Sequence, residues 1–237
     1  MTRKILAFPL LGLGLAMCMT ASPALAASTD VFVNFGAKNS YYDANIGAVT
    51  ALQGQDIKTQ NGWLLRGDAG YASYDYDITG ANIDGNLYSA DVLAGYGFQF
   101  TGGHANAYFG GGYANQDLDD TDPGTNVKGD RFGAMIAGDA TYLVADRVEL
   151  NGMGSYNTAF GTYDSRFDAG YKLASFTVGP EVGFKGNNAY DQNSYGVALS
   201  DIDLGFANTR IAAGYANTNG RAGDSSLYGT LGFERSF

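Results

Sequence analysis

The chain has few of the residues on which disulfides, metal sites and catalytic triads depend. Its 237 residues include one cysteine, Cys18, and one histidine, His104. Cys18 lies in an N-terminal apolar segment, so the rest of the chain cannot form a disulfide and must be stabilised in another way. A site with several histidines is impossible, and any Ser-His-acid arrangement must use His104.

Basic residues, prolines and long apolar runs are also scarce. The 14 Lys and Arg against 24 Asp and Glu give a formal net charge of −10, which argues against a nucleic-acid partner and against docking on anionic lipid. With 14% aromatic residues and 4 prolines, the chain is not expected to be disordered. Beyond the N-terminal segment no apolar run approaches 18 residues, which excludes helical membrane spans. An all-β protein remains.

The N-terminus has the layout of a secretory signal peptide. Arg3 and Lys4 precede an apolar run over residues 5–19, and small side chains follow at Ala24 and Ala26. We expect residues 1–26 to be removed after Ala26, with Ala27 as a near alternative site. Residues 27–237 would then form a single domain.

A lipoprotein signal is the rival interpretation of the same segment. It would place the lipid on Cys18, but Met17 stands where that signal requires a small residue. A membrane-spanning helix is disfavoured because the apolar run is short and contains Pro9.

After the leader, apolar and aromatic residues alternate with polar ones at a period of two, which is typical of β-strands. The clearest case is residues 86–100, where Tyr88, Val92 and Tyr96 share a face opposite Ser89 and Asp91. Such alternations persist for about 10 to 15 residues, longer than strands of soluble sandwiches and suited to strands crossing a bilayer. The pattern predicts a closed antiparallel transmembrane β-barrel in the outer membrane of a Gram-negative bacterium.

Twelve strands are expected, with ten as the alternative. They lie near residues 30–38, 43–53, 62–75, 85–100, 104–115, 130–143, 147–160, 162–173, 175–186, 192–200, 206–216 and 226–237. Short links at 101–103, 144–146, 174 and 201–205 alternate with longer ones at 76–84, 116–129, 186–191 and 217–225. Short periplasmic turns and longer outer loops are the rule in such barrels, so both termini should face the periplasm.

Three local features bear on this scheme. The link over residues 54–61 is long for a periplasmic turn, and Pro180 falls within a strand, where a bulge at Gly179 and Pro180 would accommodate it. The chain ends on Phe237 after alternating apolar residues, which resembles an outer-membrane assembly signal, although Arg235 departs from that pattern.

The polar face of the strands carries charges of both signs. Unpaired charges in a narrow lumen would be costly, so we expect most of them to pair between neighbouring strands and either fill the barrel or form a polar track for a hydrophilic solute. The predicted lumen charge ladder is Arg66, Asp68, Asp91, Arg131, Asp139, Arg147, Glu149, Arg166, Asp168, Lys172, Glu181 and Lys185.

No motif indicates catalysis, a cofactor or a metal. Lipid A deacylases place a Ser two residues after a His, but Asn106 stands there after His104. The run from Asp117 to Asp122 has carboxylates spaced like the start of a calcium loop, but it lacks the required Gly and the closing Glu. We therefore expect neither an enzyme nor a cofactor or metal protein.

Several motifs, in order along the chain, resemble those of the BcsS family of cellulose biosynthesis proteins. They are residues 62–66 (GWLLR), 70–71 (GY), 74–76 (YDY), 117–129, 179–181 (GPE), 186–187 (GN) and 190–192 (YDQ). The resemblance runs from about Gly62 to Tyr215 and implies an outer-membrane accessory protein of a cellulose secretion system. It carries over no catalytic residue.

The expected function is thus a non-catalytic accessory barrel that helps to export or anchor a β-linked glucan. Its expected partners are outer-membrane lipid and lipopolysaccharide, and cellulose or components of its secretion system. A small-solute porin or a structural surface barrel is the alternative. Tyr76, Tyr190 and Tyr195 are the aromatic residues of the expected outer loops that could stack on sugar rings.

Overall fold

The computed structural model describes residues 28–79, 81–118, 122, 124–220 and 224–237. The predicted leader, residues 1–26, lies outside this part of the chain. In the described part, no helix is long and apolar enough to cross a membrane.

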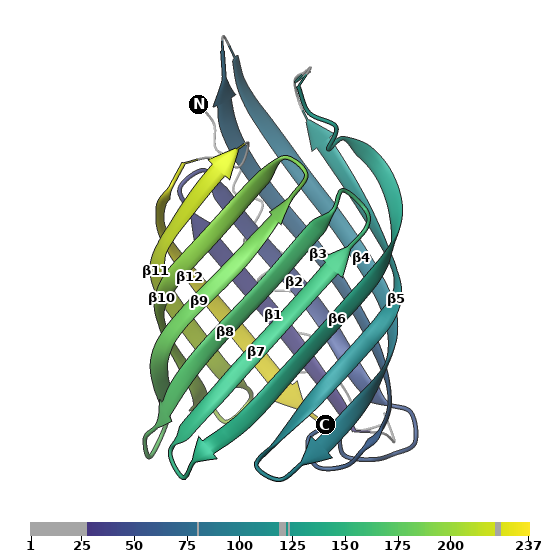
Figure 1. Ribbon diagram of the computed structural model, residues 1–237, viewed down its shortest axis with the longest axis vertical. Helices are drawn as coiled ribbons and strands as arrows, with labels where there is room; N and C mark the ends of the chain where they lie inside the picture. The colour runs from purple at the N-terminus through teal and green to yellow at the C-terminus, as the bar shows by residue number, and fades with distance from the viewer. Residues whose placement is uncertain (1–27, 80, 119–121, 123, 221–223) are drawn as a thin grey trace.

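Twelve antiparallel strands form one closed barrel, in which each strand pairs with its neighbours in sequence and β1 pairs with β12 (Figure 1). The strands are β1 (Thr29–Lys38), β2 (Tyr41–Ala51), β3 (Gly62–Ile78), β4 (Ala81–Phe100), β5 (Gly103–Leu118), β6 (Gly129–Ala145), β7 (Val148–Asn157), β8 (Thr162–Lys172), β9 (Thr177–Asn187), β10 (Tyr190–Asp203), β11 (Asn208–Gly220) and β12 (Ser226–Ser236). The predicted number of twelve is confirmed, and the ten-strand alternative is not needed.

The closure between β1 and β12 involves the last residue of the chain. Asp30 pairs with Ser236 and Lys38 with Tyr228, and the intervening residues are in continuous register. Beyond this ladder, the Phe237 amide donates to the Thr29 carbonyl at 2.9 Å, and the Thr29 amide donates to the Phe237 carbonyl at 3.2 Å. Phe237 thus helps to seal the barrel.

The two ends of the barrel differ. We call the end that carries Thr29 and Phe237 the terminal end and the opposite one the distal end. β3 to β6 have 16 to 20 residues, whereas β7, β8 and β9 have 10 or 11. The hairpin of β3 and β4 consequently projects beyond its neighbours at the top of Figure 1.

Several predicted links are wrong in length because the strands continue through them. β3 extends to Ile78 and β4 begins at Ala81, so the long loop expected over residues 76–84 is a tight hairpin. The loop expected over 186–191 shrinks in the same way, while the link expected at residue 174 widens to residues 173–176. Each end has one long link, 52–61 at the terminal end and 119–128 at the distal end, so link length does not distinguish the ends.

Pro180 is accommodated without the predicted bulge. Asp168 pairs with Glu181 and Tyr171 with Val178 in one unbroken register, and only the pairs between them, at Gly179 and Pro180, are missing from the ladder. Register shifts lie elsewhere, in β10 between Leu199 and Ile202 opposite β11 and in β6 between Leu143 and Ala145 opposite β7. Proline removes one hydrogen-bond donor without adding a residue, so the register on either side is kept.

The outward-facing residues in the middle of the strands are apolar, and the outward-facing acidic residues lie at the distal ends of strands, such as Asp130 and Asp191. Aromatic side chains form two rows on this outer surface. Trp63 contacts Tyr96 near the terminal end, with ring centroids 5.4 Å apart, and Tyr71 contacts Tyr88 nearer the distal end at 5.1 Å. Trp63 and Tyr71 are about 26 Å apart along β3 at about 3.3 Å per residue.

Candidate functional site in the barrel lumen

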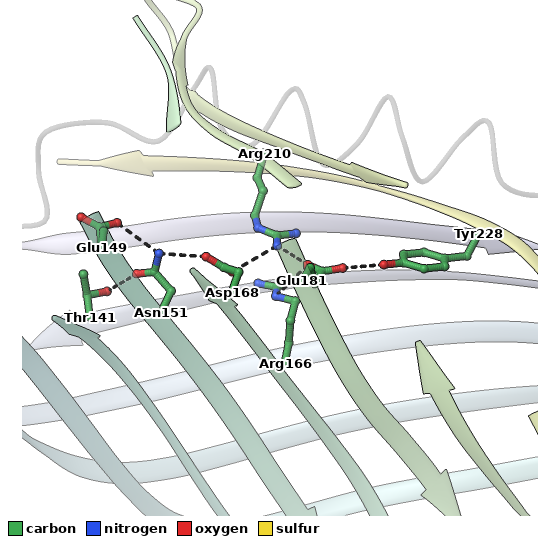
Figure 2. Close-up of polar contacts among 8 residues, drawn as sticks. All are labelled: Thr141, Glu149, Asn151, Arg166, Asp168, Glu181, Arg210 and Tyr228. Carbon is green, nitrogen blue, oxygen red and sulfur yellow. Dashed lines mark hydrogen bonds and ion pairs between the residues drawn. The ribbon is translucent and has the colours of Figure 1, made fainter. Parts of the chain in front are cut away.

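A continuous chain of polar contacts follows the inner wall from β6 to β12 (Figure 2). Because side chains alternate between the two faces of a strand, each of these strands presents its polar residues to the lumen. Asn151 on β7 connects the first part of the chain: it accepts from Thr141 at 2.8 Å and donates to Glu149 at 3.1 Å and to Asp168 at 3.0 Å. Asp168 in turn accepts from Arg210 at 3.2 Å.

Glu181 on β9 is the centre of this chain. It accepts hydrogen bonds from Arg210 on β11 and, at 2.9 Å, from the Tyr228 hydroxyl on β12, and it lies 3.8 Å from Arg166 on β8. Its exposed fraction is 4%. A carboxylate buried this deeply requires such partners, because removing a charge from water is costly unless the charge is paired.

Arg66 is the corresponding residue on the opposite wall. Its guanidinium donates to Asp68 at 2.9 and 3.1 Å and lies over the rings of Phe32 and Tyr108, with 5.5 Å to each centroid. Two aromatic faces and one carboxylate thus hold the group in place. Beside it, the apolar cluster of Val49, Ala51, Ile57, Leu64, Leu93, Tyr108 and Met135 fills this side of the lumen.

The three arginines lie where two cavities of the lumen meet, a region that we call the waist. Two cavities, of about 510 Å³ toward the terminal end and about 370 Å³ toward the distal end, share part of their lining. The shared residues define the waist and are Phe32, Asn34, Arg66, Met153, Arg166, Arg210 and Gly232. The described part of the lumen therefore holds two cavities that meet at the waist.

The long link over residues 52–61 lies across part of the terminal end. Ile57 packs into the apolar cluster, and Lys58 reaches Glu234 at 2.5 Å and Asp30 at 3.7 Å. Burial lowers the pKa of Lys58, but the Glu234 and Asp30 carboxylates outweigh this effect and hold that pKa above its ordinary value. We call this link the strap, because its charged group connects it to both closing strands of the barrel.

Apolar side chains partly cover the distal end. Val127, from the link between β5 and β6, packs with Phe160, from the link between β7 and β8, and both are almost fully buried. Arg131 lies over the Phe160 ring at 4.8 Å and donates to the Asn126 carbonyl at 3.1 Å. The links therefore fold inward over the lumen.

Most residues of the predicted charge ladder face the lumen, but two lie apart from it. Arg131 sits at the distal mouth, and Arg147 lies exposed in the link between β6 and β7. Lys172 pairs with Glu149 at 2.5 Å near the terminal end, and Lys185 lies 3.6 Å from Asp43 in the distal half. Asp91 accepts from Asn157 at 3.4 Å, and Asp139 accepts from Asn106 at 2.8 Å.

Arg210 and Tyr228 are the principal lumen residues that the sequence analysis missed. They lie on the last two strands, β11 and β12. Ile211 and Tyr215 alternate with Arg210, Ala212 and Gly214, and this pattern would have placed Arg210 on the polar face. The contact of Arg210 with Glu181 has no such signal, since it depends on which strands are neighbours.

The three predicted loop tyrosines lie in strands. Tyr76 is on β3 and Tyr190 begins β10, and both line a small distal pocket of about 40 Å³ together with Tyr41 and Tyr74. Tyr195 is on the outer surface of β10, opposite Tyr215. The expected loop position is wrong for Tyr76 and Tyr190 because β3 and β10 extend further than the sequence pattern indicated, and it is wrong for Tyr195 because that residue falls within the strand predicted over residues 192–200.

The sole histidine lines the terminal-end cavity. His104 pairs with Thr141 across β5 and β6, and Asp139 and Asn106 line the same cavity. The buried Oδ1 atom of Asn106 has no hydrogen-bond partner. Among the described residues, no group of three or more His, Cys, Asp or Glu side chains is placed to hold a metal ion.

Comparisons with solved structures find other β-barrels. The chain is similar to the KdgM porin, with a TM-score of 0.47 and 13% identity over 88% of this chain and 99% of the porin. It is similar to the deltaS2 mutant of the TodX monoaromatic hydrocarbon channel, with a TM-score of 0.50 and 8% identity over 89% of each chain. The translocator domain of the autotransporter NalP from Neisseria meningitidis gives a TM-score of 0.41 and 11% identity over 97% of this chain and 94% of that domain. At these identities the likeness concerns the fold alone.

The sequence comparisons give a more specific result. No curated protein matched the chain. A family model, described as cellulose biosynthesis protein BcsS, matches residues 33–237, which include all of the barrel except the start of β1. The chain therefore belongs to the BcsS family of cellulose biosynthesis proteins.

Proposed function

We propose that this protein is a non-catalytic accessory barrel that spans the outer membrane and serves the secretion or surface anchoring of cellulose. The family gives the association with cellulose biosynthesis. The observation that supports the accessory role is the waist: a lumen with three arginine side chains at its middle is poorly suited to threading a glucan.

The outer surface supports a position in a membrane. An apolar band about 25 Å tall between two aromatic girdles is typical of transmembrane barrels. The two rows that contain Trp63 and Tyr71 are about 26 Å apart along a strand that tilts, which fits such a band. The acidic residues at the distal strand ends, such as Asp130, would then lie in the headgroup region of the outer leaflet.

The proposed orientation places the terminal end, with Phe237, in the periplasm. Both termini of transmembrane barrels with an even number of strands lie on that side. Residues 1–26 would direct export and then be cleaved.

Gene deletion with measurement of extracellular cellulose tests the proposal. The deletion strain should produce less cellulose or hold it more loosely, while its uptake of small sugars and antibiotics stays nearly unchanged. Complementation with the wild-type gene should restore cellulose. Complementation with a variant that carries both Arg166→Ser and Arg210→Ser, which opens the waist, should increase small-sugar uptake if the barrel is assembled.

The alternative, a small-solute porin, is favoured by the polar lumen with its two cavities. It predicts the opposite outcome, with reduced sugar uptake and normal cellulose in the deletion strain. That outcome would exclude the accessory role.

A further inference from the structure

We propose that the terminal-end cavity binds a short segment of an uncharged polysaccharide. This inference rests on the proposed function only in naming a β-linked glucan as the ligand. Its preference for an uncharged, polyhydroxylated ligand follows from the cavity itself.

The cavity has the size and position of a binding site. Its volume of about 510 Å³ lies within the range of about 300–1,000 Å³ that is usual for ligand pockets. Its lining reaches from the waist to residues at the terminal ends of strands, among them Asp30, Glu149 and Asn208. The ligand would therefore enter from the terminal end and stop at the waist.

The charges of the wall disfavour an anionic ligand. Each Lys or Arg that lines the cavity has a carboxylate partner: Lys58 has Glu234 and Asp30, Arg66 has Asp68, and Arg166 and Arg210 share Glu181. An anion would have to displace one of these carboxylates and would also meet Asp139 and Glu149.

Hydroxyl groups match what remains on the wall. The carboxylates of Asp139, Asp168 and Glu149 accept hydrogen bonds, whereas the guanidinium groups of Arg66 and Arg166 donate them. A sugar hydroxyl both donates and accepts, so a polyhydroxylated chain can satisfy both kinds of group without a net charge. Phe32 and Tyr108 hold Arg66 in position, so little ordering is needed on binding.

The strap forms part of the same cavity. Ile57 and Lys58 line it, and the Gln99 side chain donates to the Ile57 carbonyl at 3.2 Å. An entering saccharide would thus contact the strap on one side and the chain of polar contacts on the other. Because three paired arginines lie at the waist, a saccharide would meet charged side chains there, and we expect the site to hold a glucan and not to conduct it.

Titration calorimetry on the full barrel purified in detergent tests the proposal, with cellohexaose as the probe and a galacturonate oligomer of the same length as the anionic control. Ser200→Trp fills the terminal-end cavity, and Ser155→Trp is the matched variant, because Ser155 lines only the distal cavity. Cellohexaose should bind with one site per chain, and Ser200→Trp should weaken this binding about ten-fold or more, since overfilling a fitted site has an effect of this order. Ser155→Trp should leave the affinity within about two-fold.

Three results would overturn the inference: no binding of cellohexaose to the wild type, equal weakening by both variants, or tighter binding of the galacturonate. Circular dichroism melting of both variants shows that each is folded before it is titrated. If cellohexaose does not bind but gene deletion still lowers cellulose, the cavity assignment fails while the proposed function stands. If cellohexaose binds but the deletion strain produces normal cellulose, the cavity assignment stands while the proposed function fails.

Discussion

Glu181 joins four strands through one carboxylate. It lies on β9 and contacts Arg166 on β8, Arg210 on β11 and Tyr228 on β12. β9 and β11 are not adjacent in the barrel, so the contact with Arg210 reaches past β10 along the inner wall.

Replacing Glu181 with Leu should destabilise the barrel by about 3–5 kcal/mol, because Arg166 would lose its buried partner and Arg210 would keep only Asp168. Lys172→Met is the control: it breaks the pair with Glu149 near the end of β8, where the Lys172 side chain is 40% exposed, and should change stability by less than about 1 kcal/mol. Reversible urea unfolding in lipid vesicles measures both. Equal destabilisation by the two changes would contradict the central position of Glu181.

At the scale of a strand, alternation decides what each substitution does. Val92 and Asp91 are neighbours on β4 but point to opposite sides of the wall. Val92 is 65% exposed on the outer surface, whereas Asp91 accepts from Asn157 inside. A change at either position therefore tests the environment of one face.

If the outer surface meets the bilayer, Val92→Arg should destabilise the barrel by about 2–4 kcal/mol, as is typical near the midplane. Asp91→Asn should have a smaller effect, because the amide can keep a hydrogen bond to Asn157. Unfolding in lipid compares the two variants. Equal tolerance of both changes would mean that the outer surface does not contact lipid.

The strand faces were readable from the sequence, but the strand ends were not. Alternation placed Arg66, Asp68 and Asp91 on the polar face, where the structure has them. It ended the third strand at residue 75, whereas β3 continues to Ile78, because Tyr76 and Ile83 bury each other with Leu118 in a separate apolar cluster. That packing joins three strands and has no local signature.

At the scale of the whole molecule, the orientation of the barrel is the property that decides its function. Since the only cysteine is Cys18, single cysteines can be introduced and labelled without interference from the described domain. Asp117 at the distal end and Asp146 at the terminal end are both exposed. Asp122, which the sequence pattern would also select, is buried and hydrogen-bonded to the Tyr76 hydroxyl at 3.0 Å.

We predict that Asp117→Cys reacts with an impermeant maleimide in intact cells, whereas Asp146→Cys reacts only after the outer membrane is permeabilised. The expectation follows from a terminal end that faces the periplasm. Labelling is read by mass shift on a gel, with the wild type as the unlabelled control. Reaction of Asp146→Cys alone in intact cells would reverse the proposed orientation.

The sequence by itself determined that this is a β-barrel of twelve strands with a charged interior, because a period of two and the positions of the turns are local properties of the chain. It did not determine which charges meet. Arg210 pairs with Asp168 and Glu181 on strands that are not its neighbours, Arg147 falls in a link, and arginines of β3, β8 and β11 line both cavities of the lumen. These features depend on register and closure, which set distances between residues far apart in sequence, so only the tertiary structure could decide them.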